Sequence, residues 1–158
     1  ATWAEFDLVN QVWSIPGERM KSGRPHRVPL TSAVMKLLTD LPRFKDAEGN
    51  DVPLVFPGRD TAKPLSDMSL TAIMRRMELD AVPHGFRSTF RDWAAEKTNY
   101  PNEVVEMALA HAIGSGTEAA YRRGDLFDKR RRLMEEWATF ISTAPAKGKN
   151  VMPLRGIA

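Results

Sequence analysis

Five residues of this sequence have side chains that could act on a phosphate group. They are, in chain order, Lys21, His84, Arg87, His111 and Tyr121. Arginine, lysine and protonated histidine bind phosphate oxygens through charged hydrogen bonds. A phenol hydroxyl can attack as a nucleophile, but its pKa is about 10, so it needs a nearby cation or base. Each of the five also has a plainer structural interpretation.

His84 and Arg87 lie three residues apart, at a point where the pattern predicts that a helix begins. This spacing places both side chains on one side of the first helical turn. The free backbone N–H groups of that turn and the positive end of the helix dipole favour an anion there. The alternatives are a phosphate site, or a histidine that caps the helix beside a surface arginine.

His111 follows an apolar helix face and precedes a Gly-Ser-Gly stretch. A lone histidine at this place is more often a capping group, because an imidazolium complements the carboxyl end of a helix. Tyr121 comes ten residues later, between two alanines and two arginines. On its own it is typical of half-buried packing, although the glycines before it give the chain freedom to present a nucleophile.

Lys21 lies at the predicted tip of a hairpin. Basic hairpin tips are often solvated turns, and the alternative is a mobile ammonium that reaches a phosphate or a leaving oxygen. The basic run 129–132 stands beside two glutamates, so pairing on a solvated helix face accounts for much of it. We assign this run no catalytic role.

Composition bounds the class of protein. The 158 residues suit one domain, and 42% hydrophobic residues permit a packed core. Zero cysteines exclude disulfides, thiolate zinc sites and thiol nucleophiles. No apolar run approaches the roughly 20 residues of a spanning helix, and the first residues do not follow the basic-then-apolar order of a secretory signal. We therefore expect a cytoplasmic protein with no membrane partner; arginine outnumbers lysine 15 to 8, which suits phosphate.

The elements that must position the five residues are a small sheet followed by helices. Residues 2–30 predict two hairpins with three strands, because turn-forming stretches at Asp7–Gln11 and Gly17–Pro25 separate short apolar runs. Thr31 is predicted to cap a helix that Pro42 ends.

Farther along, Val55 and Phe56 predict a short buried strand, and Ser66 is predicted to cap the next helix.

Apolar stripes predict that helix and three more after it. The four stripes are Leu70, Ile73, Met74 and Met77; Phe86, Phe90, Trp93 and Ala94; Val104, Val105, Ala108 and Leu109, after Pro101; and Leu133, Trp137, Phe140 and Ile141. The predicted fold class is α+β, mostly α with a small N-terminal antiparallel β-sheet. The domain covers 1–143, and 144–158 form a tail that is flexible or docks on a partner.

The order of the five residues resembles a known active site. A hairpin lysine, a His-x-x-Arg motif, Leu109-Ala110-His111-x-x-Gly114 and a tyrosine ten residues after that histidine follow one another. In this the chain is similar to the C-terminal catalytic domain of tyrosine recombinases, above all the integrases of phages and genomic islands. The resemblance runs from about Trp3 to Phe140, although many members have glycine where this chain has Ala110.

The resemblance implies site-specific DNA recombination and integration, with a recombinase catalytic fold that lacks its first helices. Tyr121 would be the nucleophile that forms a 3′-phosphotyrosyl link. Arg87 and His111 would bind a non-bridging oxygen, and His84 would bond the same phosphate or assist proton transfer. Lys21 would protonate the leaving 5′ oxygen. The implied chemistry needs no metal and no cofactor. The implied partner is double-stranded DNA at attachment sites, on which the full-length protein would form a homotetramer. The implied location is the nucleoid of a bacterial host.

The resemblance also implies a further active-site arginine before the sheet. The sequence has no arginine before Arg19, which lies in the hairpin region. We therefore expect the chain to be part of an integrase that, alone, cleaves DNA about 10²- to 10³-fold more slowly, as loss of one oxyanion donor does elsewhere.

Two other functions are compatible with the same residues. A non-catalytic DNA-binding module would use the basic residues on phosphates, and its DNA binding would be salt-sensitive without a covalent product. An enzyme like the type IB topoisomerases would use similar chemistry to relax supercoils without pairing two sites.

Overall fold

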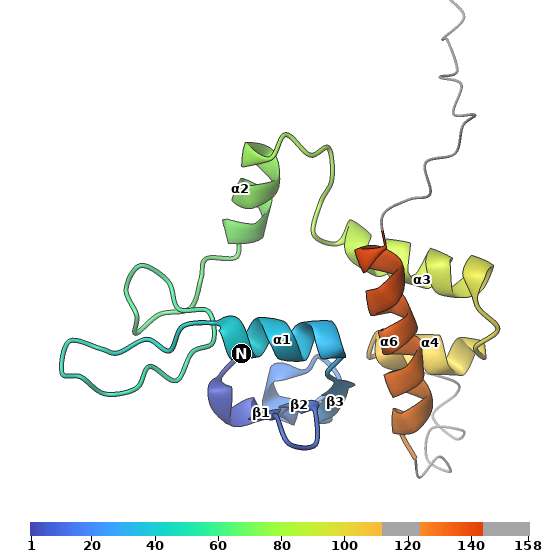
Figure 1. Cartoon of the computed structure of the whole chain (residues 1–158), viewed down its shortest axis with the longest axis horizontal. Helices are drawn as coiled ribbons and strands as arrows, with labels where there is room; N and C mark the ends of the chain where they lie inside the picture. The colour runs from blue at the N-terminus through green and yellow to red at the C-terminus, as the bar shows by residue number, and fades with distance from the viewer. Residues whose placement is uncertain (112–123, 144–158) are drawn as a thin grey trace, which may run out of the picture.

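The computed structural model describes residues 1–111 and 124–143. Within them the fold is α+β, with five α-helices and one three-stranded antiparallel sheet, as predicted. Figure 1 shows two packed groups, the sheet with α1 and a bundle of α3, α4 and α6, while α2 stands on the connection between them. No helix in this described part is long and apolar enough to cross a membrane. Tyr121 and the predicted tail 144–158 lie outside the described residues.

The sheet is a meander of β1 (Phe6–Asp7), β2 (Val12–Ile15) and β3 (His26–Pro29), which confirms the predicted three strands. A short 3-10 helix, η1 (Trp3–Glu5), precedes β1, and a second one, η2 (Gly17–Arg19), follows β2. The side chains of Phe6 and Trp13, which are paired across β1 and β2, stack with their ring centroids 5.4 Å apart.

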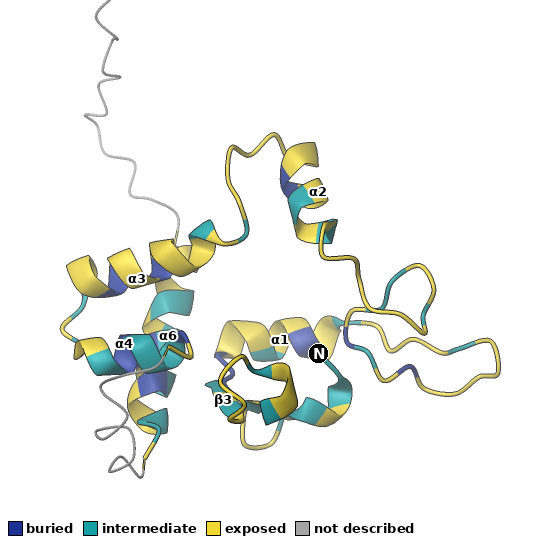
Figure 2. Ribbon diagram, turned by 180° about the vertical axis from the view of Figure 1, so that it is seen from behind, coloured by how far each residue is buried: buried dark blue, intermediate teal, exposed yellow. Residues whose placement is uncertain are grey.

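Helix α1 (Ser32–Asp40) covers the sheet. The Thr31 hydroxyl accepts a hydrogen bond from the amide of Val34 at 3.3 Å, which confirms the predicted cap. Leu38 is buried with Leu30 and Val55 in one cluster against the sheet. Leu37 of the same predicted stripe is 52% exposed, so the described residues cover only part of that stripe (Figure 2).

The predicted strand at Val55 and Phe56 is wrong. Val55 is buried, and its amide donates to the carbonyl oxygen of Ala1 at 3.1 Å, but Phe56 is exposed. Isolated bridges form on either side of these two residues, between Thr2 and Leu54 and between Pro57 and Pro64, but no strand does. Prolines at positions 53 and 57 have no N–H group, so the segment cannot extend a ladder of backbone hydrogen bonds.

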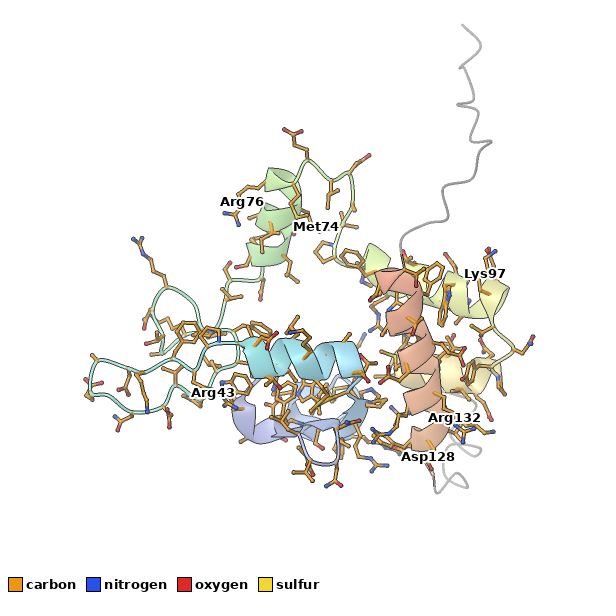
Figure 3. The ribbon with its side chains drawn as sticks, in the orientation of Figure 1. Arg43, Met74, Arg76, Lys97, Asp128 and Arg132 are labelled. Atoms are coloured by element: carbon orange, nitrogen blue, oxygen red, sulfur yellow. The ribbon has the colours of Figure 1, made fainter. Side chains whose placement is uncertain are left out.

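The predicted cap at Ser66 is also wrong. Helix α2 (Ser69–Arg76) begins three residues later, and Met68 is its N-cap without a side-chain hydrogen bond. The Ser66 hydroxyl instead accepts from the amide of Met68 at 3.3 Å, in the turn before the helix. Met74, labelled in Figure 3, is the buried residue of α2.

Helices α3 (Gly85–Lys97), α4 (Asn102–Ala108) and α6 (Phe127–Ser142) form the second packed group. Trp137 of α6 packs against α3, with its ring 5.1 Å from Trp93 and edge-on to Phe90 at 5.5 Å. Three predicted stripes thus share one core, whose buried members are Phe90, Trp93, Ala94, Val104, Val105, Leu109 and Leu133. Phe86, Phe140 and Ile141 of these stripes are exposed, and all three lie in terminal turns of their helices.

Candidate active site

The structure brings Arg87 and His111 together although 24 residues separate them in the chain. Arg87 Nη2 lies 2.7 Å from His111 Nε2 and also donates to the carbonyl oxygen of Leu109 at 2.7 Å. The shared core of α3 and α4 makes this possible, since Phe90 and Leu109 are buried in the same cluster. Both side chains of the pair remain open to solvent, so a ligand can reach them.

The hydrogen bonds of this pair fix the protonation of the imidazole. A guanidinium has five N–H donors and no acceptor, so His111 Nε2 must accept and the ring proton must lie on Nδ1. Arg87 uses only the two donors of Nη2 in these contacts. Its other N–H groups donate to none of the residues that the structure describes, and guanidinium N–H groups of this kind bind anions.

The end of α4 places His111 beside Arg87. Ala110 has a φ of 56°. The amide of His111 donates to the carbonyl oxygen of Glu106 at 2.9 Å, and the amide of Ala110 donates to the carbonyl oxygen of Met107 at 3.1 Å. This is a Schellman turn, in which the left-handed position favours glycine. It gives a physical reason for the glycine that many tyrosine recombinases carry there.

We expect Ala110→Gly to raise the free energy of unfolding by up to about 1 kcal/mol, because glycine adopts the left-handed conformation without a Cβ clash. Chemical denaturation checks it, with Ala110→Val as the matched change in the opposite direction. A glycine variant less stable than the parent would contradict this account of the turn.

Glu106 forms a second layer behind the pair. One carboxylate oxygen accepts from His111 Nδ1 at 2.6 Å, and the other accepts from Arg91 Nε at 2.9 Å. The hydrogen bond from His111 is the main reason that the pKa of Glu106 lies below its usual value. Glu106 is not among the predicted site residues; its signal in the sequence is an acidic side chain five residues before the histidine.

His84 stands immediately before α3, one turn from Arg87, whose amide donates to the His84 carbonyl oxygen at 3.1 Å. The side chain of His84 makes no capping hydrogen bond and is exposed. The capping interpretation of this histidine is therefore wrong, and the helix does begin where the sequence predicts.

Lys21 is exposed in the loop between β2 and β3, which agrees with the predicted hairpin tip. Within the described ranges it makes no hydrogen bond or ion pair, and the structure does not bring it into contact with Arg87 or His111. The prediction for Tyr121 falls outside those ranges. No group of three or more His, Cys, Asp or Glu residues that could hold a metal ion occurs in residues 1–111 and 124–143.

Tyr100 is the other tyrosine of the chain. Its hydroxyl donates to Glu136 of α6 at 2.7 Å. Burial, together with the bond to Glu136, raises the pKa of Tyr100 to about 12. This phenol is therefore held in its neutral form, and it is a poor nucleophile at neutral pH.

The interpretation of the basic run 129–132 as a solvated helix face is wrong for Arg130, which is 1% exposed. Its guanidinium donates to the carbonyl oxygen of Arg27 at 2.6 Å, to the carbonyl oxygen of Asp125 at 2.8 Å and to Asp125 Oδ2 at 2.8 Å. Arg27 Nε bonds the same carboxylate at 3.0 Å. This group, the Arg130 anchor, ties β3 to the chain just after residues 112–123, which include Tyr121. The missed signal is an arginine three residues from Leu133, on the buried side of α6.

We expect Arg130→Met to lower the free energy of unfolding by about 2–3 kcal/mol, because it removes three hydrogen bonds and leaves the Asp125 carboxylate with only Arg27. The matched control is Arg132→Met, at an exposed position of the same run (Figure 3), which should change stability by less than about 0.5 kcal/mol. Chemical denaturation measures the free energy of unfolding of both variants. Equal decreases in the two would contradict the stabilising role of the Arg130 anchor.

Comparison with known proteins gives concordant matches. The model of the phage integrase family matches residues 1–126. The chain is 33% identical to prophage integrase IntA of Escherichia coli (strain K12), covering 91% of this chain and 34% of that protein. It is 30% identical to the integrase of Shigella phage Sf6, over 88% of this chain and 36% of that protein.

The prophage integrase IntZ of Escherichia coli (strain K12) is also 30% identical, over 94% of this chain and 36% of that protein. The chain thus spans about a third of the length of these curated relatives. No solved structure matches it. Since the family match covers most of the chain, the chain belongs to the phage integrase family of tyrosine recombinases.

Proposed function

We propose that this chain carries the catalytic residues of an integrase that cuts and rejoins double-stranded DNA at specific sites through a 3′-phosphotyrosyl intermediate. The observation that carries the proposal is the exposed pair of Arg87 and His111, at the start of the segment that leads to Tyr121; some guanidinium donors of Arg87 contact none of the described residues. Family membership supports the recombinase catalytic fold and the activity.

The proposed reaction exchanges one ester bond for another. The Tyr121 oxygen attacks the scissile phosphorus, its proton passes to a base for which His84 is the candidate, and the bond from phosphorus to the 5′ oxygen breaks. Lys21 protonates that oxygen as it leaves. Because the bond energy stays in the protein link, the 5′-hydroxyl of a new strand can reverse the step without an outside energy source.

In this proposal Arg87 binds a non-bridging oxygen while negative charge develops on it. Fixed cationic donors aimed at such an oxygen typically contribute about 3 kcal/mol to catalysis. The bond from Arg87 Nη2 to the carbonyl oxygen of Leu109 can stay in place when the phosphate arrives, and it orients the guanidinium. His111 donates to the same phosphate once Nε2 takes up a proton and exchanges Arg87 for a phosphate oxygen.

The assignment of the nucleophile to Tyr121 is supported by the state of the second tyrosine. Tyr100 donates to Glu136 and its pKa is raised to about 12, so it does not compete for the role. The Arg130 anchor and the Schellman turn hold the two flanks of the segment that contains Tyr121. Recombination would pair two duplexes in a homotetramer, as in the family.

The test uses nicked duplexes of randomised sequence, from which the cut 5′-hydroxyl fragment diffuses away so that even slow cleavage accumulates. We expect a DNA–protein adduct that survives denaturing gels, and sequencing of its DNA gives the preferred site. Salt-sensitive binding without an adduct would instead support a non-catalytic module. An adduct with relaxation of supercoils but no exchange between duplexes would support a topoisomerase.

A further inference from the structure

We propose that Glu106 is a positioning residue, which holds the His111 imidazole in its Nδ1–H form so that Nε2 faces the Arg87 guanidinium. The consequence for DNA cleavage rests on the proposed function. The arrangement of the three side chains does not, and it can be tested without DNA.

The contacts of Glu106 are those of an orienting group. Its side chain is 16% exposed, against 43% for His111, so the carboxylate lies behind the imidazole, away from solvent. Within the part of the chain that the structure describes, one oxygen accepts from His111 Nδ1 at 2.6 Å and the other from Arg91 Nε at 2.9 Å. The same residue also accepts the His111 amide through its backbone carbonyl oxygen, at 2.9 Å. Glu106 therefore fixes both the backbone and the ring of the histidine.

Hydrogen-bond chemistry makes the carboxylate necessary. An ionised carboxylate only accepts, so the nitrogen that faces it must carry a proton. The opposite nitrogen, Nε2, then has a free lone pair in the neutral ring, and it accepts from Arg87 at 2.7 Å. A continuous series of hydrogen bonds thus runs from Arg91 through Glu106 and His111 to Arg87. If Nε2 later gains a proton, the Glu106 charge stabilises the imidazolium.

Glutamine at position 106 should move the ring proton of His111 from Nδ1 to Nε2. Arg91 Nε–H can only donate, so it takes the amide oxygen of the glutamine and turns the NH₂ group toward His111 Nδ1. That nitrogen must then accept, and the ring proton moves to Nε2. Nε2 can no longer accept from Arg87, so the guanidinium loses one of the two bonds that hold it.

The experiment records long-range ¹H–¹⁵N spectra of the histidine rings, in which protonated and unprotonated nitrogens have well separated shifts. The chain has only three histidines, so His→Gln variants at positions 26, 84 and 111 assign every signal. Spectra are taken near pH 8, above the usual histidine pKa of about 6.5. We expect His111 in the Nδ1–H form in the parent protein and in the Nε2–H form in Glu106→Gln. An Nε2–H ring in the parent, or no change in the variant, would overturn the proposal.

Two control variants separate positioning from a general structural role. Glu96→Gln removes the same charge at an exposed position of α3. Arg91→Met breaks the bridge between α3 and α4 but leaves the bond from His111 to Glu106. We expect the Nδ1–H form in both controls. If Arg91→Met also moved the ring proton, a general disturbance of the two helices would explain the effect and Glu106 would lose its proposed role.

A kinetic measurement follows from the proposed function. Glu106→Gln should lower the rate of adduct formation about 10- to 100-fold, the scale on which second-layer partners act at metal-bound histidines, because a neutral glutamine cannot stabilise the imidazolium form of His111 that donates to the phosphate. DNA affinity should stay unchanged. Unchanged kinetics together with a shifted ring proton would overturn the catalytic consequence. A protein that forms no adduct at all, yet shows the predicted ring spectra, would overturn the proposed function and leave the positioning intact.

Discussion

Tyr121→Phe should abolish covalent capture of DNA while DNA binding stays within about twofold of the parent. The phenylalanine ring fills the same space but has no oxygen to attack phosphorus, and loss of a nucleophile lowers the rates of covalent enzymes by about 10⁴-fold or more. Capture is measured as the fraction of labelled suicide duplex that migrates with the protein on a denaturing gel. Affinity is measured separately on an uncleavable duplex.

The matched control for this change is Tyr100→Phe, which deletes the same hydroxyl from the other tyrosine. Tyr100 donates to Glu136 and has a raised pKa of about 12, so its loss should reduce stability modestly and leave capture intact. Capture that persists in Tyr121→Phe and disappears in Tyr100→Phe would contradict the assignment of the nucleophile. Persistence in both would favour a different attacking group.

Arg87→Ala should lower the rate of capture about 10²- to 10³-fold, the usual effect of removing one oxyanion donor. The guanidinium is held by Leu109 and His111 and has further donors that contact none of the described residues, so alanine removes the group best placed to bind a phosphate oxygen. The control is Arg75→Ala, an equal loss of charge at an exposed position of α2. It should change the rate by less than about twofold, since a distant surface charge is screened by salt.

A neutral scissile linkage separates a catalytic role of Arg87 from simple DNA binding. A methylphosphonate at the cleaved position lacks the negative charge that Arg87 is proposed to stabilise. The ratio of the capture rates of the parent and Arg87→Ala should therefore be at least tenfold smaller on this linkage than on the charged one. An equal gap on the charged and neutral linkages would show that the arginine acts elsewhere.

Local chemistry made much of the fold predictable. Turn-forming residues set the limits of the three strands, and the Thr31 hydroxyl bonds the Val34 amide as a cap does. The pairing of Arg87 with His111 was expected only through the resemblance. The sequence of neither helix end specifies its partner; the shared core, in which Phe90 and Leu109 are both buried, brings the two ends together.

The failures came from residues whose role depends on distant groups. Arg130 belongs to a run that looks like a solvated face, yet it is buried because Asp125 and the Arg27 carbonyl oxygen satisfy its donors. Glu106 was missed because its carboxylate joins His111, five residues later, to Arg91 on another helix. Val55 was correctly expected to be buried, but its flanking prolines prevent a ladder.

The central claim is that Arg87, His111 and Tyr121 contact one DNA phosphate. A crystal structure of the covalent DNA adduct measures this directly, through distances from the phosphorus-bound oxygens to Arg87 and His111. We predict a phosphate on the Tyr121 oxygen, with a guanidinium nitrogen and His111 Nε2 each within about 2.7–3.2 Å of a non-bridging oxygen. A phosphate held on another residue, or one with both groups beyond hydrogen-bond distance, would contradict it.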